Sequence, residues 1–145
     1  MNEARRDVEL YIRTTPAELW KAITNPERTR LYWYDALNRS TWTPGAPWTS
    51  ESEDGELWLD GEILEVEPPH GLVQTFHIAD SAEPPSKVTW QITPMGDACR
   101  LYVTHTGLGP EALHYVTGGW EFILSGLKTL LETGQPLKGG EPSSM

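Results

Sequence analysis

Basic residues, cysteine and long apolar runs are all scarce in this sequence of 145 residues. It has 11 Lys and Arg residues against 21 Asp and Glu residues, a formal net charge of −10. Such a surface repels phosphate backbones and anionic headgroups, so nucleic acid and membranes are not expected as partners. The single cysteine, Cys99, excludes an intramolecular disulfide and a thiolate zinc cluster.

The N-terminus lacks the apolar core of a signal peptide, and no apolar run approaches the roughly 20 residues that span a bilayer. These two features predict a cytoplasmic protein. Nucleophile-elbow, P-loop and dinucleotide-binding fingerprints are also missing. The four histidines form no pair at metal-ligand spacing and have no acidic or cysteine cluster beside them. The sequence therefore predicts neither a metal site nor a cofactor.

One strong helical pattern lies near the C-terminal end of the sequence. Its apolar residues recur at steps of three and four, at Leu113, Val116, Trp120, Ile123, Leu127 and Leu130. This spacing predicts one long helix from about Glu111 to Thr133, with Gly134 as its stop. Near the other end, Thr15-Pro16 and Asn25-Pro26 are start signals for two short helices, the second running to about Leu31.

Between these helical patterns, residues alternate between apolar and polar types in several runs, as expected for strands with one buried face. The expected strands are 7–13, 48–53, 56–67, 72–77, 87–93 and 100–105, whereas residues 33–47 read as irregular. Short turns between successive strands favour a curved antiparallel sheet. The predicted fold is α+β, with this sheet wrapped around the long C-terminal helix and two short helices after the first strand. Residues 1–137 form one domain in this interpretation, and residues 138–145 a disordered tail.

Four stretches carry a resemblance to a known superfamily: residues 15–33, 61–76, 87–108 and 118–134, in this order and spacing. The sequence resembles the helix-grip superfamily of START-like domains, polyketide cyclases and the birch-pollen allergen. Within it, the sequence is most similar to the group related to the activator of heat-shock protein 90 ATPase. The resemblance implies an apolar cavity between the long helix and the sheet, used in the superfamily for lipids, sterols, polyketides or other small apolar molecules.

The residues expected to line this cavity are mostly apolar. The predicted walls are Leu19, Ile23, Phe76, Trp90, Val103, Val116, Trp120 and Ile123, with Gln74 and His105 as polar contacts to the ligand. Burial of ligand surface, at about 25 cal/mol per Å², would supply the affinity, and the polar contacts would fix the orientation. No catalytic residue is assigned, and the sequence favours binding without catalysis over enzymatic activity.

Several of these features allow two interpretations. His105 either hydrogen-bonds a ligand or acts as a general base, or it is a core histidine bonded within the protein. Gln74 either contacts a ligand or faces solvent. Asp35 is either an acid near a pocket entrance or a solvated loop carboxylate. Gly119 and Gly126 either permit close packing or leave volume for a ligand.

The favoured function is the binding of a small apolar molecule of lipid, polyketide or aromatic type. Two alternatives stay open. One is an enzyme of cyclase or hydrolase type that uses His105 in a dry cavity. The other is an interaction protein that, like an activator of a chaperone ATPase, has a chaperone partner. The oligomeric state is also open, with a homodimer among the alternatives.

Overall fold

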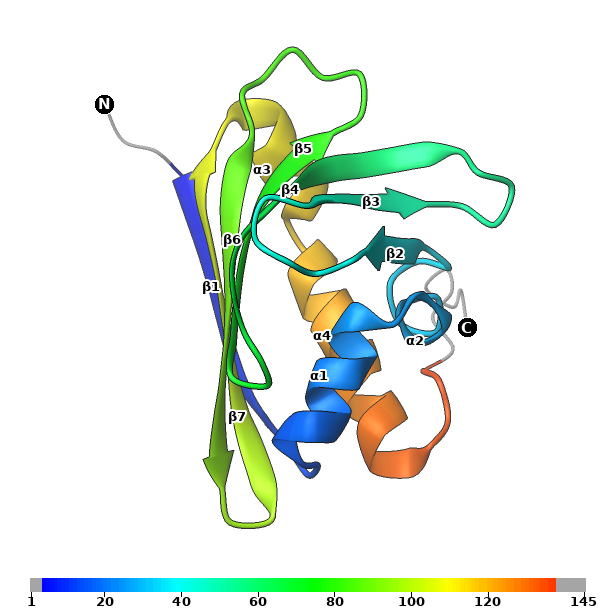
Figure 1. Cartoon of the computed structure of the whole chain (residues 1–145), viewed down its shortest axis with the longest axis vertical. Helices are drawn as coiled ribbons and strands as arrows, with labels where there is room; N and C mark the ends of the chain where they lie inside the picture. Colours follow the sequence, from blue (N-terminus) through cyan, green and yellow to red (C-terminus); the bar gives the residue numbers. More distant parts are fainter. Residues whose placement is uncertain (1–3, 138–145) are drawn as a thin grey trace, which may run out of the picture.

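The computed structural model describes residues 4–137, which form one antiparallel sheet with helices on one side (Figure 1). The strands are β1 (Ala4–Ile12), β2 (Leu37–Ser40), β3 (Pro47–Glu51), β4 (Leu57–Glu67), β5 (Gly71–Ile78), β6 (Ser86–Met95) and β7 (Ala98–Leu108). The helices are α1 (Pro16–Thr24), α2 (Pro26–Thr29), α3 (Pro110–Val116) and α4 (Gly119–Thr133). The predicted α+β fold, a curved sheet gripping a C-terminal helix, is confirmed. The tail predicted at 138–145 lies outside the described residues.

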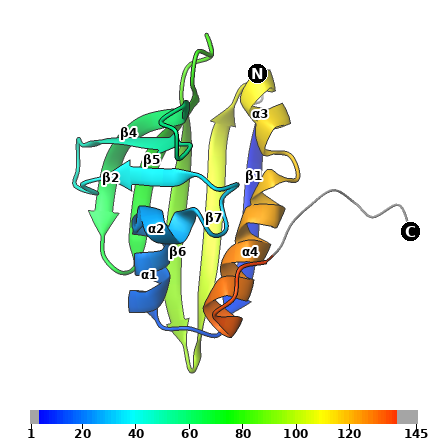
Figure 2. The same cartoon turned by 90° about the vertical axis from the view of Figure 1, so that its right-hand side faces the viewer.

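The seven strands are hydrogen-bonded in the order β1-β7-β6-β5-β4-β3-β2, and every neighbouring pair is antiparallel. The chain thus returns from β1, across the two short helices, to the opposite edge of the sheet. Register shifts interrupt the β1–β7, β3–β4 and β4–β5 pairs. Such irregularities bend strands and increase their twist, and the sheet curves around α4 and α1 (Figure 2).

The alternation of residues on the central strands places the predicted rows inside. Val88, Trp90 and Ile92 on β6 are buried, and so are the inward residues of β7 and β5. Trp120, Ile123, Leu127 and Leu130 of α4 are buried in the same core. The sheet face and the helix stripe therefore cover each other, as their patterns required.

The two short helices begin at the capping residues that the sequence predicted. The Thr15 side chain accepts a hydrogen bond from the Glu18 amide at 3.2 Å, and Pro16 occupies the first turn of α1. The Asn25 side chain caps α2 by accepting from the Glu27 amide at 2.9 Å. These caps fix where the chain leaves β1 and where it turns toward β2.

Two local predictions were wrong. The expected single helix is divided at Thr117-Gly118 into α3 and α4, because Gly118 adopts a left-handed conformation with φ of 80°. Glycine takes this conformation at no steric cost, so a helical pattern of side chains does not prevent the break. In addition, part of the segment expected to be irregular forms β2, whose four residues pair with β3. Tertiary pairing, rather than local pattern, makes this short strand.

Candidate functional site

All ten residues predicted to contact a ligand are buried between the helices and the sheet. Little space is left among them. The cavity in this region has a volume of about 20 Å³ and is lined by Trp33, Tyr34, Phe76, Tyr115, Val116, Gly119, Trp120 and Ile123. Four of the predicted residues are in this lining, whereas Leu19, Ile23, Gln74, Trp90, Val103 and His105 are not. A space of this size is enough for about one water molecule.

Tryptophan side chains fill the region where the sequence predicted a cavity. The Trp120 ring lies 5.5 Å from the Trp33 ring and 5.6 Å from the Trp90 ring, both in edge-to-face contact. Trp33 and Trp90 are 6.3 Å apart. These are favourable aromatic geometries, and they make this part of the molecule a packed core. Trp33 was not among the predicted wall residues.

His105 is fully buried and uses both ring nitrogens within the protein. The Trp120 indole N–H donates to His105 Nδ1 at 3.0 Å. An indole nitrogen can only donate, so the imidazole proton lies on Nε2, which donates to Ser86 Oγ at 2.7 Å. Ser86 Oγ in turn donates to the Phe76 carbonyl at 3.2 Å. Burial lowers the pKa of His105 to about 4, so the ring is neutral at pH 7.

Gln74 also faces the interior and not solvent. Its Oε1 accepts a hydrogen bond from the Trp90 indole N–H at 2.7 Å. The two polar side chains predicted as ligand contacts therefore each satisfy the N–H of a core tryptophan. Burying an indole without such a partner is costly, which explains a glutamine and a histidine in an apolar row.

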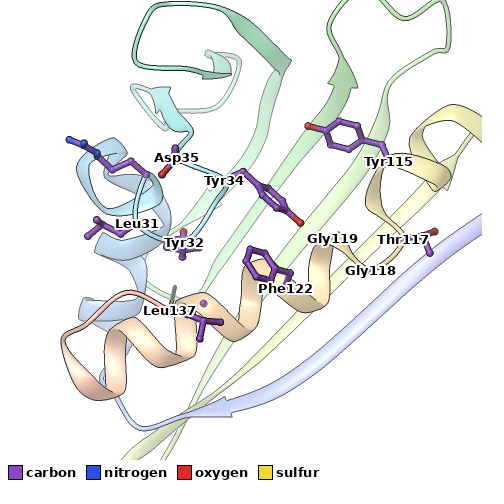
Figure 3. Close-up of a pocket in the computed structure, with 12 residues that line it drawn as sticks. Leu31, Tyr32, Tyr34, Asp35, Tyr115, Thr117, Gly118, Gly119, Phe122 and Leu137 are labelled. Carbon is purple, nitrogen blue, oxygen red and sulfur yellow. The ribbon is translucent and has the colours of Figure 1, made fainter. Parts of the chain in front are cut away.

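A large open groove lies beside this core, on the helical face of the molecule (Figure 3). Its volume is about 690 Å³, within the range of small-molecule sites. Most of its lining comes from two segments distant in sequence, the chain between α2 and β2 and the region around the α3–α4 break, and Gly126 and Leu137 complete it. Its lining is Arg30, Leu31, Tyr32, Tyr34, Asp35, Tyr115, Thr117, Gly118, Gly119, Phe122, Gly126 and Leu137.

The Tyr34 and Phe122 rings stack on each other at the centre of the groove, with ring centres 5.3 Å apart and planes 23° apart (Figure 3). Tyr34 is 49% exposed and Phe122 is 36% exposed, so the stack presents aromatic surface to solvent. Tyr34, Tyr115 and Gly119 line both the groove and the small cavity. The stack therefore lies at the boundary between open groove and closed core.

The backbone at Tyr34 and Asp35 is in the left-handed region, with φ of 50° and 62°. This conformation is uncommon for residues other than glycine, and two in succession carry strain. The neighbouring Tyr32 anchors the turn, because its buried hydroxyl donates to the Ala22 carbonyl at 2.8 Å. The anchored, strained turn holds the Tyr34 ring over α4.

The polar groups of the groove differ in whether the protein already satisfies them. Arg30 is paired with Glu27 and Glu53, and Thr117 is hydrogen-bonded to Arg6 and to the Leu113 carbonyl. By contrast, within residues 4–137 the Asp35 carboxylate makes no hydrogen bond or ion pair. Burial raises the pKa of Tyr34 and of Tyr115, so both phenols stay protonated at neutral pH. An acceptor and two hydroxyl groups are thus available to a ligand.

The two glycines of α4 have different surroundings. A Cβ atom at Gly126 would lie 3.2 Å from the Tyr32 Cβ, so this glycine permits close packing of the segment after α2. A Cβ atom at Gly119 would have only the Tyr34 hydroxyl within reach, at 3.9 Å. Gly119 thus leaves space in the groove.

The rings of Tyr34, Tyr115 and Phe122 were not among the predicted ligand contacts, because these residues lie outside the apolar stripes of the sequence. The signal that could have identified them is the presence of aromatic residues at positions where the pattern expects exposed side chains.

The fold defines a class of protein, a helix-grip domain, and here an open groove lies beside its C-terminal helix. The family described as "Activator of Hsp90 ATPase homolog 1-like protein" matches residues 13–132, and the chain belongs to this family. A search of curated proteins finds no match. Among residues 4–137, no three His, Cys, Asp or Glu side chains cluster as a metal site would require, and no helix is long and apolar enough to cross a membrane.

Solved structures share the fold. CalU16 from Micromonospora echinospora is 22% identical, with a TM-score of 0.74, over 91% of this chain and 78% of that one. Protein MLL2253 from Mesorhizobium loti is 27% identical, with a TM-score of 0.75, over 88% and 96%. PFC0360w, an HSP90 activator from Plasmodium falciparum, is 19% identical, with a TM-score of 0.75, over 88% and 95%. The family and its neighbours are consistent with a ligand-binding helix-grip domain.

Proposed function

We propose that this protein binds a small apolar molecule in the groove between the α2–β2 segment and α4. The observation that carries the proposal is the preformed space of about 690 Å³ whose centre is an exposed aromatic stack. Half-exposed aromatic side chains gathered in one concave site are typical of ligand pockets. The four predicted residues that line the small cavity, Phe76, Val116, Trp120 and Ile123, would form the floor beneath the ligand.

The proposal needs no proton transfer. His105 has its Nδ1 occupied by the Trp120 N–H and its proton directed at Ser86, so it offers a ligand no free nitrogen. Its role in the proposal is to orient Trp120, one of the floor residues. Ligand affinity would come from removal of apolar surface from water, at about 25 cal/mol per Å².

Gly119→Leu tests the location of the site. The new side chain starts in open space beside the Tyr34 hydroxyl and would extend into the groove. We expect titration calorimetry with 2-naphthol to show binding by the original protein and binding at least about tenfold weaker in the variant. Ser125→Leu, which adds the same side chain at an exposed α4 position outside the groove lining, is the matched control. Equal affinity in all three proteins would contradict the groove as the site.

The family supports a second candidate, a link to an Hsp90-type chaperone. The family description names an activator of the Hsp90 ATPase, and one structural neighbour is an HSP90 activator. In this role the protein would raise the rate of ATP hydrolysis by the chaperone. Measuring that rate with and without the protein separates the two candidates, and an unchanged rate across a concentration series would reject the second.

A homodimer is also compatible with the family, since a neighbour from Colwellia psychrerythraea is an Aha1 dimer.

A further inference from the structure

We infer that the groove selects a planar aromatic molecule that carries a hydrogen-bond donor, such as an aryl amine or a phenol. The inference rests on the proposed binding function and narrows its ligand class. Two features carry it: the Tyr34–Phe122 stack at the centre of the groove, and the Asp35 carboxylate at its edge.

The aromatic stack favours flat ligands over other apolar ones. The two rings are only 23° from parallel and together offer a flat surface that solvent reaches. A planar ring system can lie against such a surface with face or edge contact, whereas a saturated ring is puckered and has no π-system. The strained but anchored turn at Tyr34 holds the platform in place before a ligand arrives, which reduces the entropy cost of binding.

The charged side chains that line the groove favour a hydrogen-bond donor, rather than an anionic group, on the ligand. Asp35 accepts hydrogen bonds and cannot donate them when ionised, and it has no partner within the described part of the chain. The basic residue in the groove lining, Arg30, is already shared between Glu27 and Glu53. The chain as a whole carries a net charge of −10. A donor on the ligand is therefore favoured at this edge, and an anion is repelled.

A matched series of small compounds tests planarity. 2-Naphthol and decahydro-2-naphthol have the same carbon skeleton and hydroxyl group, but only the first is flat and aromatic. By titration calorimetry at pH 7, we expect 2-naphthol to bind about tenfold more tightly. Tyr34→Leu and Phe122→Leu should remove most of this difference, while Tyr34→Phe, which keeps the ring, should preserve it. Tyr11→Leu is the control, because Tyr11 is also 49% exposed but lies on β1 outside the groove.

A second series tests charge. The cation 2-naphthylmethylamine should bind at least about tenfold more tightly than the anion 2-naphthoate. Asp35→Asn should remove most of this preference and leave the smaller part that the net charge of the chain supplies. Asparagine tolerates the left-handed backbone of this position, so the variant is expected to fold. Circular dichroism of every variant confirms the fold before binding is compared.

The outcomes separate this inference from the proposed function. Equal binding of 2-naphthol and its saturated analogue, unchanged in Tyr34→Leu, would leave apolar binding intact and refute the aromatic selection. Tighter binding of 2-naphthoate than of 2-naphthylmethylamine would refute the role of Asp35. It would indicate instead that a hydrogen-bond donor of the groove binds an acceptor on the ligand. Binding of neither alcohol to the original protein would overturn the proposed function and this inference with it.

Discussion

His105→Leu tests how much the hydrogen bond between Trp120 and His105 contributes to the stability of the core. Leucine has a similar size but no nitrogen, so the Trp120 indole N–H loses its acceptor in a fully buried position. Ser86 keeps its bond to the Phe76 carbonyl, so only one donor is left unsatisfied. An unsatisfied buried donor costs about 1–3 kcal/mol. We expect the variant to be less stable than the original protein by this amount at pH 7.

The same substitution should also remove a pH dependence. The pKa of His105 is lowered from 6.5 to about 4 in the folded protein, so the unfolded chain takes up the proton first as the pH falls. The stability conferred by the neutral ring is complete above pH 6.5 and is lost as the pH falls from 6.5 toward 4. At about 1.4 kcal/mol per pKa unit, the step from pH 7 to pH 5 costs the original protein about 2 kcal/mol through this group.

Urea unfolding followed by circular dichroism at pH 7 and at pH 5 measures both effects. The free energies of unfolding should approach each other at pH 5, because only the original protein pays the cost of protonating His105. His77 titrates with the opposite sign, since its hydrogen bond to the Ser81 carbonyl raises its pKa, but it is present in both proteins and cancels in the difference. If the free energy of unfolding changed by the same amount between pH 7 and pH 5 in both proteins, the buried, neutral state of His105 would be refuted.

Two further substitutions test local packing and capping. Gly126→Leu should destabilise the fold by about 1–3 kcal/mol, since even its Cβ meets Tyr32 at 3.2 Å; a melting temperature equal to that of Ser125→Leu would contradict this close contact. Thr15→Ala should cost about 1 kcal/mol in urea unfolding, because the Glu18 amide loses its cap at the start of α1. Thr14→Ala removes a hydroxyl one residue away that caps nothing in α1, so a similar loss in both variants would reject the capping role.

Local sequence patterns determined most of the architecture. Period-two alternation on the strands and the three-four spacing around Trp120 specify which faces are buried, because a side chain's direction follows from backbone periodicity. Thr15-Pro16 and Asn25-Pro26 specify helix starts, because a cap is satisfied by residues two or three positions away. The break at Gly118 escaped prediction because the side-chain spacing continues across it, while the turn depends on backbone freedom that glycine permits without requiring.

The site itself was decided by tertiary structure. The sequence could place Gln74 and His105 in inward rows, but it could not show that Trp90 and Trp120 would use their acceptor atoms. Nor could it show that three tryptophan rings would pack together in the expected cavity and that only about 20 Å³ would remain beside two of them. The centre of the groove is formed where Tyr34, held in a strained turn, stacks on Phe122 of a distant helix. Free volume and the pairing of buried polar atoms depend on side chains from distant segments, and therefore only the packed chain determines them.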